Sequence, residues 1–237
     1  MALDLGDRLY AIGDIHGRAD LLDRLYGLIR ADAAAAPAGR RLAVHLGDYV
    51  DRGRDSRGVI ERVMAPDLPG FSSVALLGNH DLMMREFLSD PMEWGPGWLA
   101  PVNGGDATLE SYGVAPPRRV EDFPRARDRL AHALPAAHRA FLDGLAPFHA
   151  DGPYLFVHAG IKPGVKLASQ VLDDLVWIRE EFLDSDAEHG HVVVHGHTTM
   201  PAPERRGNRI GVDTGAWRTG ILTAAALSAG EPRFLST

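Results

Sequence analysis

The sequence contains no cysteine, and this absence excludes several kinds of site. Without a thiol there can be no disulfide framework, no thiolate zinc site, no iron–sulfur cluster and no cysteine nucleophile. Any metal ion that this chain binds must therefore be held by nitrogen and oxygen atoms. The 11 histidines become the residues of interest, and the question is which of them gather in one place.

Long hydrophobic runs and an excess of positive charge are also missing. The best candidate for a membrane span, residues 221–227, is far shorter than the ~20 apolar residues that a spanning helix needs. The first residues are acidic and apolar without a basic leader, so we predict no secretory signal, no membrane association and a cytoplasmic location. Lys plus Arg number 25 against 32 Asp plus Glu, and this net charge of −7 argues against a nucleic-acid partner.

Length and composition are those of a folded globular chain. The 237 residues are 45% hydrophobic and 24% charged, which excludes wholesale disorder and allows a sizeable core. We predict a single domain over residues 1–237, with an inserted lobe at about 91–150. A monomer is compatible with this composition.

Three strand–loop–helix units open the chain. Apolar runs at residues 9–12, 42–46 and 74–77 each end in a polar loop and are followed by apolar residues at helical spacing. Such repeated units predict a parallel sheet flanked by helices. In sheets of this kind the ligand site lies beyond the carboxyl ends of the strands, where the polar loops meet.

The pattern changes between residues 91 and 150. Tryptophan, proline and glycine are followed by Arg- and Ala-rich helical stretches at 124–134 and 136–145, which predict an inserted helical lobe. Later apolar runs at 154–157 and 192–194 lead into histidines. Together with the segments 208–212, 221–227 and 233–235, they predict further strands and a second sheet.

Five predicted strand ends carry side chains that can bind metal or phosphate. In chain order they are Asp14 and His16; Asp48, Asp51 and Arg52; Asn79 and His80; His158; and His197. One such residue would be typical of an ordinary polar turn. Five in succession at the same end of neighbouring strands are not expected from turn chemistry, so they predict one shared site.

These motifs resemble the signature of the calcineurin-like metallophosphoesterases. The matching segments are Gly13-Asp14-Ile15-His16-Gly17, Gly47-Asp48-Tyr49-Val50-Asp51-Arg52-Gly53, Gly78-Asn79-His80, His158 and Gly196-His197-Thr198. Within the family, Asp51-Arg52-Gly53 resembles the phosphoprotein phosphatase branch in its bacterial and phage-lambda-like form. The resemblance implies an α/β fold of four layers, α/β/β/α, in which helices flank a β-sandwich. The lobe at 91–150 lies outside the resemblance.

The resemblance also implies a centre of two divalent metal ions. Asp14, His16 and a bridging Asp48 would hold the first ion, and Asp48, Asn79, His158 and His197 would hold the second. Imidazole, carboxylate and amide ligands without sulfur suit Mn²⁺, Fe or Zn²⁺ better than Ca²⁺. Manganese is the ion that we expect, with iron or zinc as alternatives.

The reaction that the resemblance implies is direct hydrolysis of a phosphate ester by water activated between the two ions. The family pattern assigns His80 as the donor of a proton to the leaving oxygen, with Asp51 orienting and charging its imidazole. Arg52 and Asn79 would contact the substrate phosphate, and Arg179 matches the second phosphate-binding arginine of the lambda-like enzymes. A solvated Arg179 paired with a neighbouring glutamate is the competing interpretation.

We therefore expect a protein phosphatase that acts on phosphoserine and phosphothreonine, and also on phosphotyrosine, in phosphorylated proteins or peptides. Asp81 favours a different substrate: most protein phosphatases have Glu after Gly-Asn-His, and Asp resembles the bacterial diadenosine tetraphosphatases. Those hydrolases usually lack the counterpart of Asp51, so we give Asp51 more weight than Asp81. A non-catalytic phosphate-binding scaffold is a further alternative, but it requires a missing ligand. A nuclease or phosphodiesterase is disfavoured because Gly196-His197-Thr198 lacks a further histidine.

The remaining histidines are expected to have other roles. His195 is assigned to a position behind the ligands or to packing, and His45 to the core, since it falls inside a predicted strand. The five others are expected at the surface: His132, His138, His149, His189 and His191.

Overall fold

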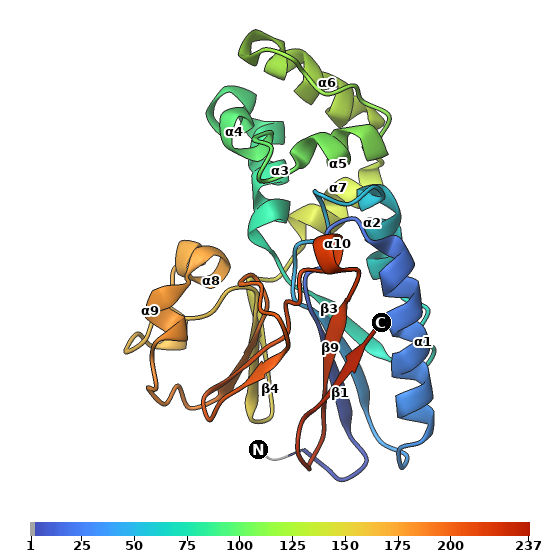
Figure 1. The fold of residues 1–237 in the computed structure, drawn as a ribbon, viewed down its shortest axis with the longest axis vertical. Coiled ribbons are helices and arrows are strands. Elements are labelled where there is room, and N and C mark those ends of the chain that lie inside the picture. The colour runs from blue at the N-terminus through green and yellow to red at the C-terminus, as the bar shows by residue number, and fades with distance from the viewer. Residues whose placement is uncertain (1–2) are drawn as a thin grey trace.

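The computed structural model describes residues 3–237, which form two five-stranded sheets packed face to face with helices outside them (Figure 1). Residues 1 and 2, which the predicted domain includes, lie outside the described part of the chain. Helices α1 (Ala19–Ala34) and α2 (Ser56–Met64) cover the outer face of the first sheet. Helices α8 (Leu172–Trp177) and α9 (Glu180–Leu183) lie outside the second. The predicted fold class, a four-layer α/β/β/α arrangement, is confirmed.

The first sheet contains the three predicted strand–loop–helix units. Its strand order is β10-β9-β1-β2-β3, with β1 (Arg8–Ile12), β2 (Arg41–His45), β3 (Ser72–Ala75), β9 (Thr223–Leu227) and β10 (Arg233–Ser236). Strands β1, β2 and β3 are parallel, and the register pairs Ile12 with His45 and His45 with Ala75. Their carboxyl ends are therefore level, and the loops that follow them emerge at one edge.

The second sheet has the order β4-β5-β6-β8-β7. Its strands are β4 (Phe148–Asp151), β5 (Tyr154–Val157), β6 (Val192–His195), β7 (Glu204–Arg205) and β8 (Arg209–Gly211). Strands β5, β6 and β8 run parallel to one another. Two consecutive parallel strands thus deliver their following loops, with His158 and His197, to the same edge of this sheet.

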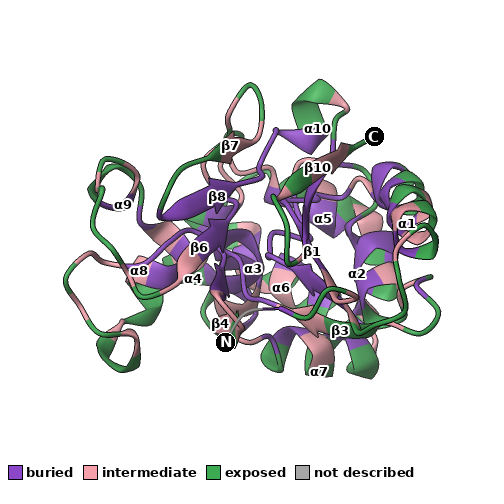
Figure 2. Cartoon of the chain, turned by 90° about the horizontal axis from the view of Figure 1, so that it is seen from below, coloured by how far each residue is buried: buried purple, intermediate pink, exposed green. Residues whose placement is uncertain are grey.

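Alternation along the strands separates the two cores. Leu9 and Ala11 of β1 pack with Phe156 and Val194 of the second sheet, so they form the layer between the sheets. Ile12, at the opposite parity, packs with the apolar face of the helices. Figure 2 shows the buried residues concentrated in the strands, with exposed residues on the outer sides of the helices. This is the pattern of a sandwich covered on both sides.

A group of helices follows α3 (Asn79–Ser89) and stands above the sheets in Figure 1. It comprises α4 (Pro91–Trp98), α5 (Gly105–Ser111), the short 3₁₀ turn Val120–Asp122, α6 (Phe123–Ala133) and α7 (Ala136–Asp143). A second 3₁₀ turn, Leu167–Ser169, precedes α8. The helical run ends at Gly144, so the last residues of the predicted 91–150 lobe instead form β4, which pairs with β5.

None of the helices within residues 3–237 is long and apolar enough to cross a membrane.

Candidate dinuclear metal site

The polar loops after the parallel strands meet at one edge of the sandwich and are tied together by main-chain hydrogen bonds. The amide of His16 donates to the carbonyl of Asp48 at 2.8 Å, and the amide of Gly196 donates to the carbonyl of His158 at 2.8 Å. The amide of His197 donates to Asp14 Oδ2 at 3.0 Å, which joins the two sheets. The structure therefore brings the predicted ligands from β1, β2, β3, β5 and β6 into one place.

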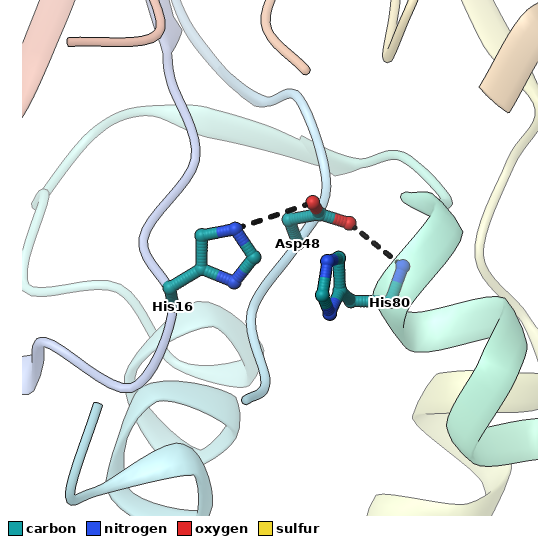
Figure 3. A group of neighbouring side chains, drawn as sticks. All are labelled: His16, Asp48 and His80. Carbon is teal, nitrogen blue, oxygen red and sulfur yellow. Dashed lines mark hydrogen bonds and ion pairs between the residues drawn. The ribbon is translucent and has the colours of Figure 1, made fainter. Parts of the chain in front are cut away.

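Asp48 lies at the centre of this group (Figure 3). Its Oδ2 is 3.4 Å from His16 Nε2, and its Oδ1 is 3.5 Å from His158 Nε2. The amide of His80, at the start of α3, donates to Oδ1 at 2.9 Å. Each carboxylate oxygen thus faces a different histidine, as a ligand that bridges two ions requires.

Two groups of side chains have ligand atoms that all lie within 4.8 Å of one another, and Asp48 belongs to both. One contains His16 and His80, and the other contains His158 and His197. Burial alone would raise the pKa of Asp48, but charge interactions with the surrounding histidines lower it well below its ordinary value.

The arrangement of hydrogen bonds shows that the imidazoles present lone pairs to the site. His158 Nδ1 donates to the carbonyl of Leu46 at 2.9 Å, so its Nε2 is unprotonated in the neutral ring. That Nε2 nevertheless lies 2.9 Å from Asn79 Oδ1, which is also an acceptor. His16 repeats the pattern, because its Nδ1 donates to the carbonyl of Val50 at 2.8 Å. Acceptors that face one another in a buried site call for a cation between them.

Further acceptors point to the same conclusion. Asn79 Oδ1 accepts from His197 Nδ1 at 2.8 Å, which leaves Nε2 of that ring unprotonated in its neutral form. Asp14 belongs to neither of the two groups, but its Oδ1 is buried without a hydrogen-bond partner among the described residues, as is His197 Nε2. Burial raises the pKa of Asp14, and the nearby carboxylates of Asp213 and Asp48 add to this effect. These lone pairs therefore suit divalent cations, and the six residues remain the predicted ligands.

Asp81 has a role in the structure that its position in the motif did not reveal. Its carboxylate accepts from the amides of Asp48 at 2.7 Å, Tyr49 at 3.0 Å and Gly78 at 3.1 Å. It thereby joins the loop after β2 to the first turn of α3. The sequence analysis used Asp81 only as an indicator of the substrate, because no local pattern shows which backbone a carboxylate will reach.

The predicted proton donor is paired as expected. His80 Nδ1 lies 2.7 Å from Asp51 Oδ2, and both side chains are buried. Asp51 also accepts from Trp98 Nε1 at 2.9 and 3.0 Å to its two oxygens, and from Thr108 Oγ1 at 2.7 Å. Burial raises the pKa of Asp51, and these three partners oppose that rise. Trp98 and Thr108 come from α4 and α5, and sequence reasoning did not connect either with Asp51.

Arg52 and Arg179 approach the site from different sides. Arg52 Nη1 is 2.7 Å from His16 Nε2, and its Nη2 is 3.0 Å from His80 Nε2, so the guanidinium lies across the mouth of the site. Arg179 is exposed and donates to Thr198 Oγ1 at 3.2 Å, beside the His197 loop. It forms no ion pair with the neighbouring glutamates among residues 3–237.

Backbone strain is concentrated in the same loops. In the described chain, the residues other than glycine with positive φ are His16, Asp48, Asp51, Arg52 and His197, with φ between 44° and 73°. All five are predicted site residues. L-residues avoid this left-handed region, so these conformations are held by the surrounding contacts.

Among the histidines predicted at the surface, His132 is exposed as expected, and His138 is buried, so its prediction is wrong. The other three are half-buried: His149, His189 and His191. His45 is buried and bonded to the hydroxyl of Tyr26 at 2.8 Å, as expected for a core histidine. His138, which was expected at the surface, is buried because its Nδ1 pairs with the hydroxyl of Tyr112 at 2.9 Å. His195 lies behind the ligand loop, where its ring packs edge-on against Phe182 with 5.2 Å between centroids.

Comparison with known proteins identifies the family. Residues 7–219 match the family model of the calcineurin-like phosphoesterases, so the chain belongs to that family. It is a hydrolase of the metallophosphoesterase kind, a family that uses a dinuclear centre of divalent metal ions, and the fold and site described above agree with this.

The names of the similar curated proteins specify a reaction, which the family model does not. The chain is 36% identical over 155 residues to the symmetrical bis(5'-nucleosyl)-tetraphosphatase of Delftia acidovorans, a match that covers 65% of this chain and 45% of the relative. The protein of the same name from Dechloromonas aromatica is 34% identical over 154 residues, covering 65% and 44%. The chain thus matches less than half the length of these relatives.

Solved structures support the fold. A structure provisionally described as a diadenosine tetraphosphatase superposes with a TM-score of 0.64 at 19% identity, covering 100% of this chain and 98% of the other. The cold-active protein-tyrosine phosphatase of a Shewanella species superposes with a TM-score of 0.59 at 15% identity, covering 99% and 83%. At these identities the likeness concerns the fold alone.

Proposed function

We propose that this chain hydrolyses dinucleoside tetraphosphates symmetrically, so that diadenosine tetraphosphate and water give two molecules of ADP. The observation that carries this proposal is the 36% identity over 155 residues to symmetrical bis(5'-nucleosyl)-tetraphosphatases. Asp81 supports it, because its identity already favoured this substrate over a phosphoprotein. The diadenosine tetraphosphatase was the alternative in the sequence analysis and is now the first candidate. The protein phosphatase becomes the second candidate.

Bound divalent ions would lower the pKa of water and withdraw charge from the phosphate oxygens. The residues that would hold them are Asp14, His16, Asp48, Asn79, His158 and His197, and we expect the ions to be manganese. Asp48 belongs to both groups of neighbouring ligand atoms and lies between them. Asp81 accepts from the backbone amides of the loop that carries Asp48, so the Asp48 carboxylate stays in place while substrate enters and leaves.

The residues of the chain then handle phosphate and proton. The oxygen of water forms a bond to one of the two central phosphorus atoms, and the bond from that phosphorus to the bridging oxygen breaks. The bridging oxygen leaves with the other ADP, and a proton of the attacking water is released to solvent. The phosphate oxygen of the departing ADP takes a proton from His80 Nε2, while Asp51 holds the imidazole by its Nδ1. The forked guanidinium of Arg52 binds non-bridging oxygens, and Arg179 and Asn79 would add further contacts.

The test is the product pattern. Purified protein loaded with Mn²⁺ is incubated with diadenosine tetraphosphate, and nucleotides are separated by ion-exchange chromatography. We expect ADP as the sole product, and Asp48→Asn should yield almost none. Intact substrate with the wild-type protein, or equal amounts of AMP and ATP, would refute the proposal.

A specific observation favours the second candidate, a phosphatase of phosphoserine, phosphothreonine and phosphotyrosine. The buried Asp51–His80 pair, 2.7 Å apart, is suited to protonate a poor leaving group such as a serine alkoxide. The test is a side-by-side turnover measurement on phosphoserine peptide, phosphotyrosine peptide and diadenosine tetraphosphate, with His80→Asn as control. Faster turnover of a phosphopeptide would make the phosphorylated protein the substrate. A non-catalytic scaffold would bind one Mn²⁺ or none per chain.

A further inference from the structure

A pocket lies beside the metal-ligand cluster, and Arg52 contacts both. The cluster is the group of expected metal ligands: Asp14, His16, Asp48, Asn79, His158 and His197. The pocket encloses about 550 Å³ and lies between the first turn of α1, the loop from Arg52 to Asp55 and Trp217 of α10 (Ala216–Thr219). This volume is within the range of small-ligand pockets, roughly 300–1,000 Å³. None of the six expected metal ligands lines it, so it is a separate space next to the catalytic centre.

Arg52 is the wall between the two spaces. One side of its guanidinium contacts His16 and His80, at 2.7 and 3.0 Å. The guanidinium also lies over the ring of Trp217, with 5.3 Å from Cζ to the ring centroid. Its Nε is buried without a hydrogen-bond partner among the described residues. Arg52 can therefore contact a phosphate group at the metal ligands and a second group in the pocket.

The charges around the pocket favour an anion. Arg54 is exposed, and among residues 3–237 its side chain forms no ion pair or hydrogen bond. Arg52 likewise has no carboxylate partner there. Arg18, in contrast, is neutralised by a forked pair with Asp20 at 2.7 and 2.8 Å.

Two guanidinium groups without a carboxylate partner in the described chain, those of Arg52 and Arg54, thus flank Gly53. The carboxylate of Asp55 also lines the pocket, but it caps α2 by accepting from the amide of Gly58 at 2.8 Å. Three arginines against two carboxylates suit a polyphosphate better than a single phosphate.

Trp217 provides the other element of a nucleotide site. Its side chain is 41% exposed although tryptophan is usually covered in a folded chain. It lines the pocket next to Arg52, whose guanidinium lies over its ring. An exposed indole ring beside Arg52 and Arg54, the latter unpaired among the described residues, can stack a base while the two arginines bind its phosphates.

We propose that this pocket is the binding site for one nucleoside diphosphate end of the substrate, with the base on Trp217 and the phosphates on Arg54 and Arg52. The inference rests on the proposed function, because it assigns a place to the half of a dinucleoside tetraphosphate that extends away from the metal-ligand cluster. It also predicts selectivity: a substrate must carry a base and several phosphates to occupy both spaces.

Binding of ADP tests the site without any turnover. Isothermal titration calorimetry on the Mn²⁺-loaded protein compares ADP with inorganic pyrophosphate, which has the phosphates and lacks the base. We expect Trp217→Ala to weaken ADP binding about tenfold or more with little effect on pyrophosphate, and Trp217→Phe to retain most of the affinity. Arg54→Gln should weaken both ligands. The matched controls are Met92→Ala and Arg24→Gln, exposed side chains that do not line the pocket.

Two results would overturn the inference. If Trp217→Ala leaves ADP affinity unchanged, no base stacks there. If it weakens ADP and pyrophosphate equally, Trp217 acts only by holding Arg52. Failure of the proposed function is a separate outcome, because wild-type protein would then leave diadenosine tetraphosphate intact whatever the ADP measurements give. Selective binding of ADP with hydrolysis of phosphopeptides alone would keep the pocket as a nucleotide site and reject the tetraphosphatase.

Discussion

The metal-ligand cluster and the Asp51–His80 pair are neighbours, yet different parts of the chain hold them in place. The ligands stand on loops that leave the parallel strands, and main-chain carbonyls of those loops orient His16 and His158. Asp51 is instead held by Trp98 and Thr108, from helices that lie above the sheets. The first arrangement belongs to the sandwich itself, whereas the second depends on the added helices. Metal binding and proton donation should therefore be separable by mutation.

The largest effect should come from the cluster. Asp48→Asn removes the negative charge that faces both groups of ligands, and we expect turnover of any substrate to fall by at least ~10³-fold. Manganese content, measured by inductively coupled plasma mass spectrometry, should drop below two ions per chain. Two ions with normal turnover would show that Asp48 does not bridge them.

A smaller and more selective effect is expected for the pair. Asp51→Asn leaves His80 without its carboxylate partner, so hydrolysis of a phosphomonoester should fall by ~10²-fold. An anhydride has a better leaving group and should lose less. The Mn²⁺ content should stay at the wild-type level, and a loss of metal would contradict the separation of the two regions. The measurement is kcat/KM on p-nitrophenyl phosphate, phosphoserine peptide and diadenosine tetraphosphate.

Trp98→Phe tests whether the added helices serve the pair. The substitution removes the N–H that bonds both oxygens of Asp51, so kcat should fall about tenfold while KM changes little. Burial raises the pKa of Asp51 and the lost N–H opposed that rise, so the acidic limb of the rate profile should move to higher pH. Trp94→Phe, in the same helix, is the control. Matching profiles for the two variants would reject a positioning role for Trp98.

The smallest effect on activity is expected outside both regions, at His45. Burial lowers the pKa of His45 from 6.5 to about 4, so the unfolded chain binds this proton first as the pH falls. The stability is fully present above pH 6.5 and declines towards pH 4, by about 3 kcal/mol. Urea unfolding of wild type and His45→Gln should show a flatter pH dependence in the variant. Parallel curves would mean that His45 is not kept neutral by the fold.

The two regions also differed in how far they could be predicted. The ends of the strands can be predicted from local sequence, because apolar runs end in Asp, Asn or His. Parallel strands then place those ends together. The family resemblance supplied the pairing of His80 with Asp51. The bond from Trp98 to Asp51 joins residues 47 positions apart, and no local pattern indicates which indole will meet which carboxylate. Trp217 was overlooked for the same reason, since only the fold brings it next to Arg52.

The five left-handed residues carry a consequence for the evolution and engineering of this chain. Each of them costs ~1 kcal/mol or more, which is a sizeable share of the margin by which a domain stays folded. Glycine at Arg52 would relieve that cost, and selection for heat resistance alone would favour it. The conformations that the site requires therefore lower the free energy of unfolding of the whole fold. Ancestral or consensus stabilisation should leave residues 16, 48, 51, 52 and 197 untouched.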